Sequence, residues 1–179
     1  MIVKIDLTPE SIQNALDELE KYKAWIDRKT EELVRRLGEI GVEITKTNFE
    51  QAQYAGDNDV QVRLDDLGER RVAVVAYGDA TWFIEFGTGV TFTNPHPEAS
   101  KFGAVRGGYG QRRGANPRGW SYTGIPGQIP PPETEIRTSK KGKQYVHTKG
   151  NPSGMCMYLA EEELRQRFKE IAQEVFAGE

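Results

Sequence analysis

Residues 80–90 read ATWFIEFGTGV, and the interpretation of this stretch decides the expected fold. A single carboxylate, Glu85, lies within a run of aromatic and aliphatic residues, and Gly87-Thr88-Gly89 follows directly. In an extended strand over residues 81–86, successive side chains alternate between two faces, so Trp82, Ile84 and Phe86 would share one face and Glu85 would point to the other. We therefore expect a short strand that ends in a glycine-rich turn.

Two further strands are expected before this stretch. Val60, Val62 and Leu64 alternate with polar residues, and a second candidate strand covers residues 71–77, after a turn at residues 66–69. The short spacing and the turn residues predict a small antiparallel sheet of three to four strands.

The N-terminal region carries the signals of a long helix. Thr8-Pro9-Glu10 combines a hydroxyl N-cap, proline at the first helical position and an acid in the first turn. One apolar stripe follows, at three- and four-residue steps: Ile12, Leu16, Leu19, Ile26, Leu33, Leu37 and Ile40. Lys23 and Thr30 interrupt it, so the helix is expected to bend or to bury only part of itself. Gly38 and Gly41 leave its end open, and we favour a helix from about Pro9 into the forties.

A long insertion and a last helix complete the predicted order. The insertion, at about residues 91–151, includes a polar hairpin over 135–150 that turns at Lys141-Gly142. A helix is expected from about residue 151, with one apolar face: Met157, Leu164, Phe168, Ile171, Val175 and Phe176. The fold class is therefore α+β: one domain over 1–179, with the C-terminal helix packed on the sheet.

Composition narrows the class of protein. Apolar residues make up 37% of the 179 residues, and no apolar run approaches the roughly 20 residues of a membrane span. The start of the chain does not resemble a signal peptide, and the single cysteine, Cys156, fits a reducing cytoplasm. Two widely spaced histidines make a structural zinc site an unfavoured interpretation. We expect no cofactor and no membrane association.

The net charge of −3 conceals a strong asymmetry. Residues 100–150 contain ten Lys or Arg against two Glu, which gives +8. The other fourteen basic and twenty-five acidic residues give −11. A basic insertion on an acidic body is suited to contact nucleic acid or the acidic body of a neighbouring copy.

Glu85 and Gly87-Thr88-Gly89 each have a chemical and a structural interpretation. A catalytic carboxylate needs a second titratable group, and none is adjacent to Glu85 in sequence, so we favour a structural role in which it accepts backbone N–H or hydroxyl bonds or pairs with an arginine of another subunit. The Gly-Thr-Gly segment lacks the lysine and the third glycine of phosphate-binding motifs, which favours a sharp turn. Cys156 is interpreted as a small core residue.

The arginine-rich part of the insertion, residues 101–122, also contains four aromatic residues: Phe102, Tyr109, Trp120 and Tyr122. Aromatic side chains between cations can stack on bases. Contact with protein is the favoured interpretation, and nucleic-acid contact and a freely solvated loop are the alternatives.

The order of elements carries a family resemblance. The segments FIEFGTG (83–89) and NPSGMCMYLAEEEL (151–164) resemble the tailed-bacteriophage tail-completion family, also called head–tail joining or neck proteins, of the minor tail protein Z type. Residues 82–89 match its Glu-Phe-Gly-Thr hallmark, and residues 94–114 resemble an elaboration in members from phages of Gram-positive hosts. The long basic insertion departs from the family, as does Asn-Pro-Ser-Gly-Met in place of a Pro-Phe pair.

The resemblance implies a non-enzymatic virion protein, made in the host bacterial cytoplasm, at the junction of head and tail. Its implied partners are further copies of itself in a ring, expected to be a hexamer, and neighbouring proteins such as the tail terminator, the connector and the tail tube. Contact with genomic DNA in the channel is the alternative, and a hydrolase that uses Glu85 is a third. The residues expected to carry interaction or structure are Trp82, Glu85, Phe86, Gly87, Thr88, Gly89, Lys101, Arg106, Arg112, Arg113 and Arg118.

Overall fold

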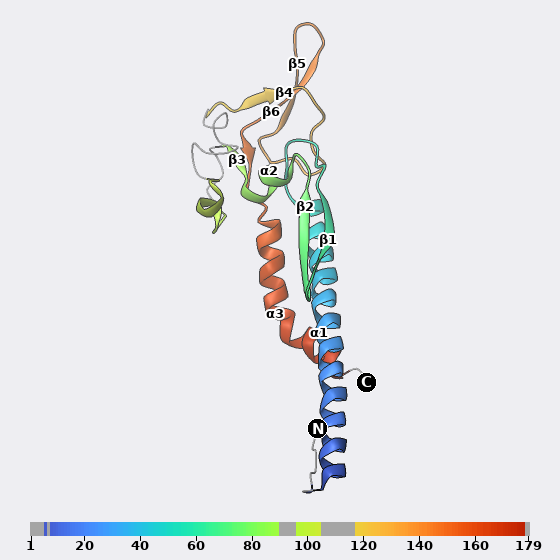
Figure 1. The fold of residues 1–179 in the computed structure, drawn as a ribbon. Coiled ribbons are helices and arrows are strands. Elements are labelled where there is room, and N and C mark those ends of the chain that lie inside the picture. The colour runs from blue at the N-terminus through green and yellow to red at the C-terminus, as the bar shows by residue number, and fades with distance from the viewer. Residues whose placement is uncertain (1–5, 7, 90–95, 105–116, 178–179) are drawn as a thin grey trace.

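The N-terminal helix α1 runs from Pro9 to Gln51, over 43 residues, and forms the long axis of the molecule (Figure 1). The structure is a computed structural model that describes residues 6, 8–89, 96–104 and 117–177. The side chain of Thr8 caps α1 by accepting a hydrogen bond from the Ser11 N–H, as the sequence predicts. Neither Gly38 nor Gly41 ends the helix.

Gly38 and Gly41 instead allow a hairpin to pack closely on α1. Strands β1 (Gln61–Gly68) and β2 (Arg71–Tyr77) pair antiparallel, with Leu64 opposite Val74. A Cβ atom on Gly38 would lie 2.6 Å from the Leu64 side chain and 2.8 Å from that of Val72. The hairpin therefore lies directly along the middle of α1 (Figure 1). Both predicted strands are confirmed, but the predicted turn at 66–69 is displaced, because β1 continues to Gly68 and the chain turns at residues 69–70.

The predicted third strand is wrong, because residues Thr81–Phe86 form a short helix, α2. Asp59 supports its start by accepting the backbone N–H groups of Asp79 and Ala80, each at 2.8 Å. The segment is apolar on both sides, so neither a period of two nor a helical period decides its structure. Tertiary contacts favour the helix, which sends Ile84 into the core and Glu85 toward the last helix.

The remaining strands are antiparallel but belong to two further small sheets. Strand β3 (Thr88–Gly89) pairs with β7 (Gly150–Asn151), and β4 (Trp120–Tyr122) and β5 (Glu135–Thr138) both pair with β6 (Gln144–Thr148). A short 3₁₀ helix, η1, covers Ala99–Phe102. The predicted polar hairpin is confirmed as β5 and β6, and it projects from one end of the molecule (Figure 1).

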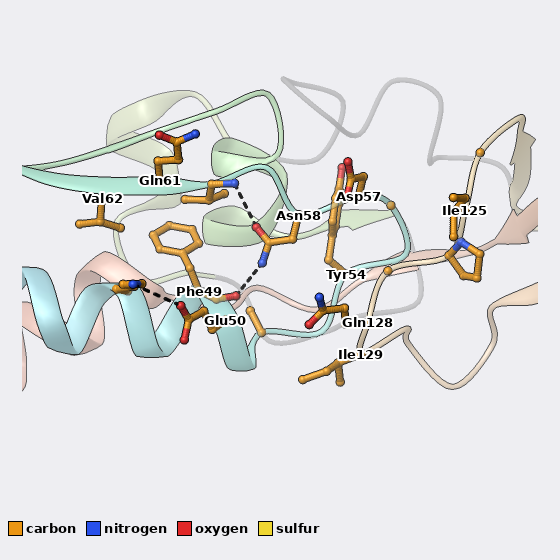
Figure 2. A pocket seen from close by; sticks show the side chains of 17 residues that line it. Phe49, Glu50, Tyr54, Asp57, Asn58, Gln61, Val62, Ile125, Gln128 and Ile129 are labelled. Atoms are coloured by element: carbon orange, nitrogen blue, oxygen red, sulfur yellow. Dashed lines mark hydrogen bonds and ion pairs between the residues drawn. The ribbon is translucent and has the colours of Figure 1, made fainter.

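The loop at residues 124–129 ties the insertion to the body. The Tyr54 N–H donates to the Ile129 carbonyl at 3.0 Å, and the Gly127 N–H donates to the Ala55 carbonyl at 3.1 Å. An open groove of about 860 Å³ lies between this loop and the end of α1, with Phe49 on one side and Ile125 on the other (Figure 2).

The last helix, α3 (Cys156–Ala177), runs beside α1 (Figure 1). It begins five residues after Asn151, because β7 and a tight turn come first. Ile171 and Val175 are buried as predicted, but Phe168 is 50% exposed and does not belong to the core. The cluster of buried apolar residues lies where α1, α2 and α3 meet, around Phe49, Ile84 and Cys156.

Candidate functional site

Helix α2 gives the ATWFIEFGTGV segment two distinct sides. The rings of Trp82 and Phe86, one helical turn apart, stack with their centroids 5.2 Å apart. Ile84 is fully buried on the other side, against Phe49 and Cys156. The face assignment from a strand, which grouped Ile84 with the two aromatic residues, is therefore wrong.

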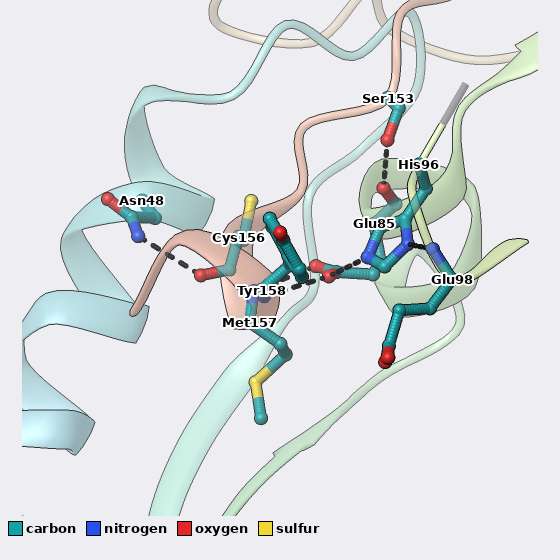
Figure 3. A network of polar contacts seen from close by, with 8 residues as sticks. All are labelled: Asn48, Glu85, His96, Glu98, Ser153, Cys156, Met157 and Tyr158. Carbon is teal, nitrogen blue, oxygen red and sulfur yellow. Dashed lines mark hydrogen bonds and ion pairs between the residues drawn. The ribbon is translucent and has the colours of Figure 1, made fainter. Parts of the chain in front are cut away.

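Glu85 is buried, with only 6% of the residue exposed, and its side chain caps helix α3 (Figure 3). Its Oε2 atom accepts the Met157 N–H at 2.9 Å, and its Oε1 atom accepts the Tyr158 N–H at 3.2 Å. The first N–H groups of a helix have no partner within the helix, and the helix dipole favours a negative charge there. Glu85 thus acts as an N-terminal cap supplied from a distant part of the chain, in agreement with the structural role predicted for it.

The Glu85 backbone strengthens the same junction. Its carbonyl oxygen accepts the Met155 N–H at 3.1 Å and the Ser153 hydroxyl at 2.5 Å, and the Ile84 carbonyl accepts the Gly154 N–H at 2.7 Å. These bonds join the end of α2 to the turn before α3. The position of the carboxylate is consequently fixed by both its backbone and its side chain.

His96 is the third partner of the Glu85 carboxylate. Its Nδ1 atom accepts the Glu98 N–H at 3.0 Å, so the proton of the neutral ring lies on Nε2, which donates to Glu85 Oε1 at 3.0 Å (Figure 3). His96 is buried, with only 5% of the residue exposed. Its ring lies between those of Phe86 and Tyr158, at centroid distances of 4.6 and 5.4 Å. The pair is therefore a hydrogen bond between a carboxylate and a neutral imidazole.

An apolar recess of about 460 Å³ adjoins this pair. Its wall includes Trp82, Phe86 and Met157, and Phe102 from η1 packs edge-on against Trp82 at 6.1 Å. The segment 96–104 is thus held to the body at two points, by the His96 imidazole and by the Phe102 ring.

Gly87-Thr88-Gly89 holds the base of the insertion. Gly87 has φ 75°, and a Cβ atom there would lie 2.6 Å from the Ser153 nitrogen, so the glycine is needed for both conformation and space. The Thr88 hydroxyl donates to Asn151 Oδ1 at 2.6 Å. Asn151 Nδ2 donates in turn to the Phe83 carbonyl at 2.8 Å. Residues 87–89 therefore join the two ends of the insertion, and Gly87 makes the sharp turn that the sequence predicts.

Cys156 occupies the first position of α3 and is fully buried. Burial, together with the nearby negative charge of Glu85, raises the pKa of its thiol to about 12. A thiol that keeps its proton is a poor nucleophile, so Cys156 behaves as the small core residue that the sequence predicts.

The cations of the insertion differ in how they are neutralised. Lys149 pairs with Glu133 at 3.0 Å and Arg137 pairs with Glu135 at 2.8 Å, near Arg118 in the turn before β4. Lys101 pairs with Glu98 on η1.

At the tip of the β5–β6 hairpin, Lys140, Lys141 and Lys143 are exposed, and no carboxylate of the described residues forms an ion pair with them. Arg106, Arg112 and Arg113 lie outside the described residues.

The predicted site residues therefore form two groups. Trp82, Glu85 and Phe86 lie around one junction with the Gly87–Gly89 turn, whereas the cations belong to the insertion. Sequence reasoning missed His96 and Asn151 as partners of this junction. His96 stands eleven residues from Glu85 and Asn151 sixty-three from Thr88, and no spacing rule links such positions.

Within residues 6, 8–89, 96–104 and 117–177, no three His, Cys, Asp or Glu side chains cluster in a way that could hold a metal ion. In the same part of the chain, every helix is too short or too polar for a membrane span. Comparison of the chain with models of protein families, with curated proteins and with solved structures finds no match in any of the three.

Proposed function

We propose that this protein is a structural component of the neck of a tailed bacteriophage, which completes the tail or joins it to the head. The observation that carries the proposal is the use made of the Glu-Phe-Gly-Thr hallmark. Glu85 caps α3, Gly87 makes the turn and Thr88 holds Asn151, so the motif supports a platform from which the cationic insertion departs. A motif whose polar groups are bonded within the protein fits a structural part better than a reaction site.

In this proposal the chain forms a ring, with six subunits as the expected number, at the capsid-proximal end of the tail. A ring needs two different faces on each subunit. The acidic body and the basic insertion supply faces of opposite charge. Such charges guide docking, and apolar contacts then hold it. The neighbours would be further copies, the tail terminator, the connector or the tail tube.

The tip of the β5–β6 hairpin is the part of the described insertion that is best suited to grip an acidic partner. Lys149 and Arg137 are already paired with Glu133 and Glu135. The three lysines at the tip are exposed, and the β5–β6 hairpin that carries them projects from the end of the molecule (Figure 1). Their charge is therefore available to an approaching protein.

Charge reversal tests this proposal. The triple variant Lys140→Glu/Lys141→Glu/Lys143→Glu should fold as the wild type does but fail to assemble into particles, and so should Arg112→Glu/Arg113→Glu. The matched control reverses three exposed cations of the body, Lys21, Arg36 and Lys169, and should assemble. Immunogold labelling of particles should find the wild-type protein at the head–tail junction. Normal assembly by both insertion variants, or label elsewhere on the particle, would reject the proposal.

Contact with genomic DNA is the second candidate, and the same three lysines favour it, since phosphates attract unpaired cations. The two candidates differ in their response to salt. Binding to DNA should weaken steeply as salt rises, by roughly 0.9 logarithmic units per phosphate contact for each tenfold increase. A ring held by apolar contacts should weaken much less. Fluorescence anisotropy with a labelled duplex, over a salt series, separates them.

A hydrolase that uses Glu85 is the weakest candidate. Both carboxylate oxygens accept hydrogen bonds from backbone N–H groups, and Oε1 also accepts one from His96. A general base needs an oxygen that can take a proton from a bound substrate. The Glu85→Gln variant separates the roles: a structural part can retain particle assembly, whereas an enzyme would lose turnover.

A further inference from the structure

The first third of α1 extends beyond the elements that cover the rest of the helix. Near the end of α3, Phe176 packs edge-on against Trp25 with centroids 5.7 Å apart. At the turn of the β1–β2 hairpin, Arg70 pairs with Asp27 at 2.7 Å. These two contacts mark where α3 and the hairpin end along α1. Residues 9–24, here called the overhang, continue beyond both elements (Figure 1), and Ala15 is the one buried residue of this stretch.

The overhang carries an apolar stripe that the described chain leaves exposed. Five large side chains have exposed fractions from 36% to 50%: Ile12, Leu16, Leu19, Tyr22 and Ile26, the last of which lies just past the overhang. They follow one another at steps of four, three, three and four residues, which places them on one side of a helix. The stripe continues into the covered part of α1, where Ile40 is buried. Most helical stability in proteins comes from the packing of an amphipathic face, so a partner for the stripe would stabilise this part of α1.

The spacing of the stripe indicates which partner fits. Steps of four, three, three and four read the same in both directions from Leu19. When two such helices lie antiparallel about a two-fold axis, Ile12 therefore meets Ile26 of the second copy, Leu16 meets Tyr22, and Leu19 meets its own equivalent. A two-fold interface requires this kind of self-complementary surface. We propose that two copies of this protein pair antiparallel through the overhang.

The size and charge of the stripe predict a weak dimer that salt strengthens. Five large residues a side fall well below the 20–30 residues a side of a standard interface. Glu18 and Glu20 flank Leu19 and would approach the same glutamates of the second copy near the axis. Salt screens that repulsion, so added salt should favour the dimer. The proposal is independent of the role in a phage neck, because it concerns the purified protein alone.

Cysteine cross-linking tests the two-fold geometry. The native Cys156 is fully buried and does not compete. Leu19→Cys should form a disulfide-linked dimer under mild oxidation, seen on a non-reducing gel. Asp17→Cys, on the opposite side of the helix, is the control and should form at least tenfold less. The double variant Ile12→Cys/Ile26→Cys should cross-link much faster than either single variant. Equal rates for Leu19→Cys and Asp17→Cys would overturn the proposal.

Sedimentation equilibrium tests the association itself. The wild-type mass should rise with concentration from 20.2 kDa toward twice that value, more readily at high salt. Leu16→Glu/Leu19→Glu should remain a monomer, with circular dichroism showing that the body stays folded. Asn14→Glu/Lys21→Gln makes the same change in charge on the opposite face and should still dimerise. A wild type that stays monomeric up to its solubility limit, or that forms rings without dimers, would contradict antiparallel pairing.

Discussion

The Oε2 atom of Glu85 accepts the backbone N–H of Met157 at 2.9 Å, across seventy-two residues of sequence. Through this bond, a carboxylate on the short helix α2 becomes the cap of the long helix α3. The whole insertion lies between the two residues in sequence, yet its two ends leave from a single buried junction. The stability of the body and the position of the insertion therefore depend on the same few groups.

Replacement of Glu85 by alanine should destabilise the fold severely. The change removes the acceptor of two helix N–H groups and of His96. Buried donors left without a partner cost about 1–3 kcal/mol each before relaxation, so we expect a loss of about 3 kcal/mol in the free energy of unfolding. Urea denaturation measures it. Glu162→Ala, an exposed change on α3, the helix that Glu85 caps, should stay within about 0.5 kcal/mol of the wild type. Similar losses for both variants would contradict the capping role.

Gly87→Ala should be much more costly than Gly142→Ala. Both glycines have positive φ, at 75° and 80°. An added Cβ atom costs on the order of 1–3 kcal/mol in backbone strain at such positions, and Gly87, with ψ 171°, lies in a region that is essentially confined to glycine. At Gly87 the same atom also meets the Ser153 nitrogen at 2.6 Å, whereas nothing lies within 4 Å at Gly142. A thermal melt should show a far larger decrease in Tm for Gly87→Ala. Equal decreases would show that the backbone around Gly87 shifts easily to make room for the Cβ atom.

Stability should fall at alkaline pH because of Cys156. The unfolded chain ionises this thiol near its ordinary pKa of about 8.5, whereas the folded protein raises the pKa to about 12. The folded state then holds more protons, so the contribution of the thiol is complete below pH 8.5 and is lost as pH rises toward 12. The slope is at most about 1.4 kcal/mol per pH unit. Urea denaturation of Cys156→Ala between pH 8 and 10 should show a shallower decline. Parallel curves would place the thiol in contact with solvent.

Asp59 should support α2 only when it is ionised. Hydrogen bonds from the N–H groups of Ala80 and Asp79 lower the pKa of its carboxyl group. Its contribution is present above the ordinary pKa of about 3.9 and is lost as pH falls through the lowered value. Asp59→Ala should cost about 1 kcal/mol at pH 7, the usual effect of a lost cap, and much less at pH 2–3. Asp57→Ala, two residues away and exposed, is the control. A pH-independent cost would contradict this mechanism.

Local signals predicted the elements whose structure depends on their own residues. Thr8 and Pro9 start α1 for local reasons. The threonine hydroxyl accepts a backbone N–H that has no partner within the helix, and proline has a helical φ and no N–H that needs a partner. The hairpin turns at Lys141-Gly142 because glycine can adopt the φ of 80° found there. The fold class followed from the order of such elements.

Long-range contacts determine the features that local sequence patterns did not predict. Residues 81–86 are apolar on both sides, so their helix depends on the burial of Ile84 and on the bonds that Glu85 makes with α3. Gly38 and Gly41 resembled helix-ending signals, and only the packing of the hairpin explains them. At the site, Glu85 was identified as structural, but its partners Met157, Tyr158 and His96 come from segments whose approach no local pattern encodes.

The length of α1 fixes a distance. A helix of 43 residues, at about 1.5 Å per residue, is a rod of roughly 65 Å. The cationic hairpin projects near one end of this rod and the exposed stripe occupies the other (Figure 1). Two partners bound at the two ends of α1 are therefore held apart by a stiff helix, and the number of helical turns sets the distance between them. Insertion of one heptad into α1 would lengthen that distance by about 10 Å while preserving the phase of its faces.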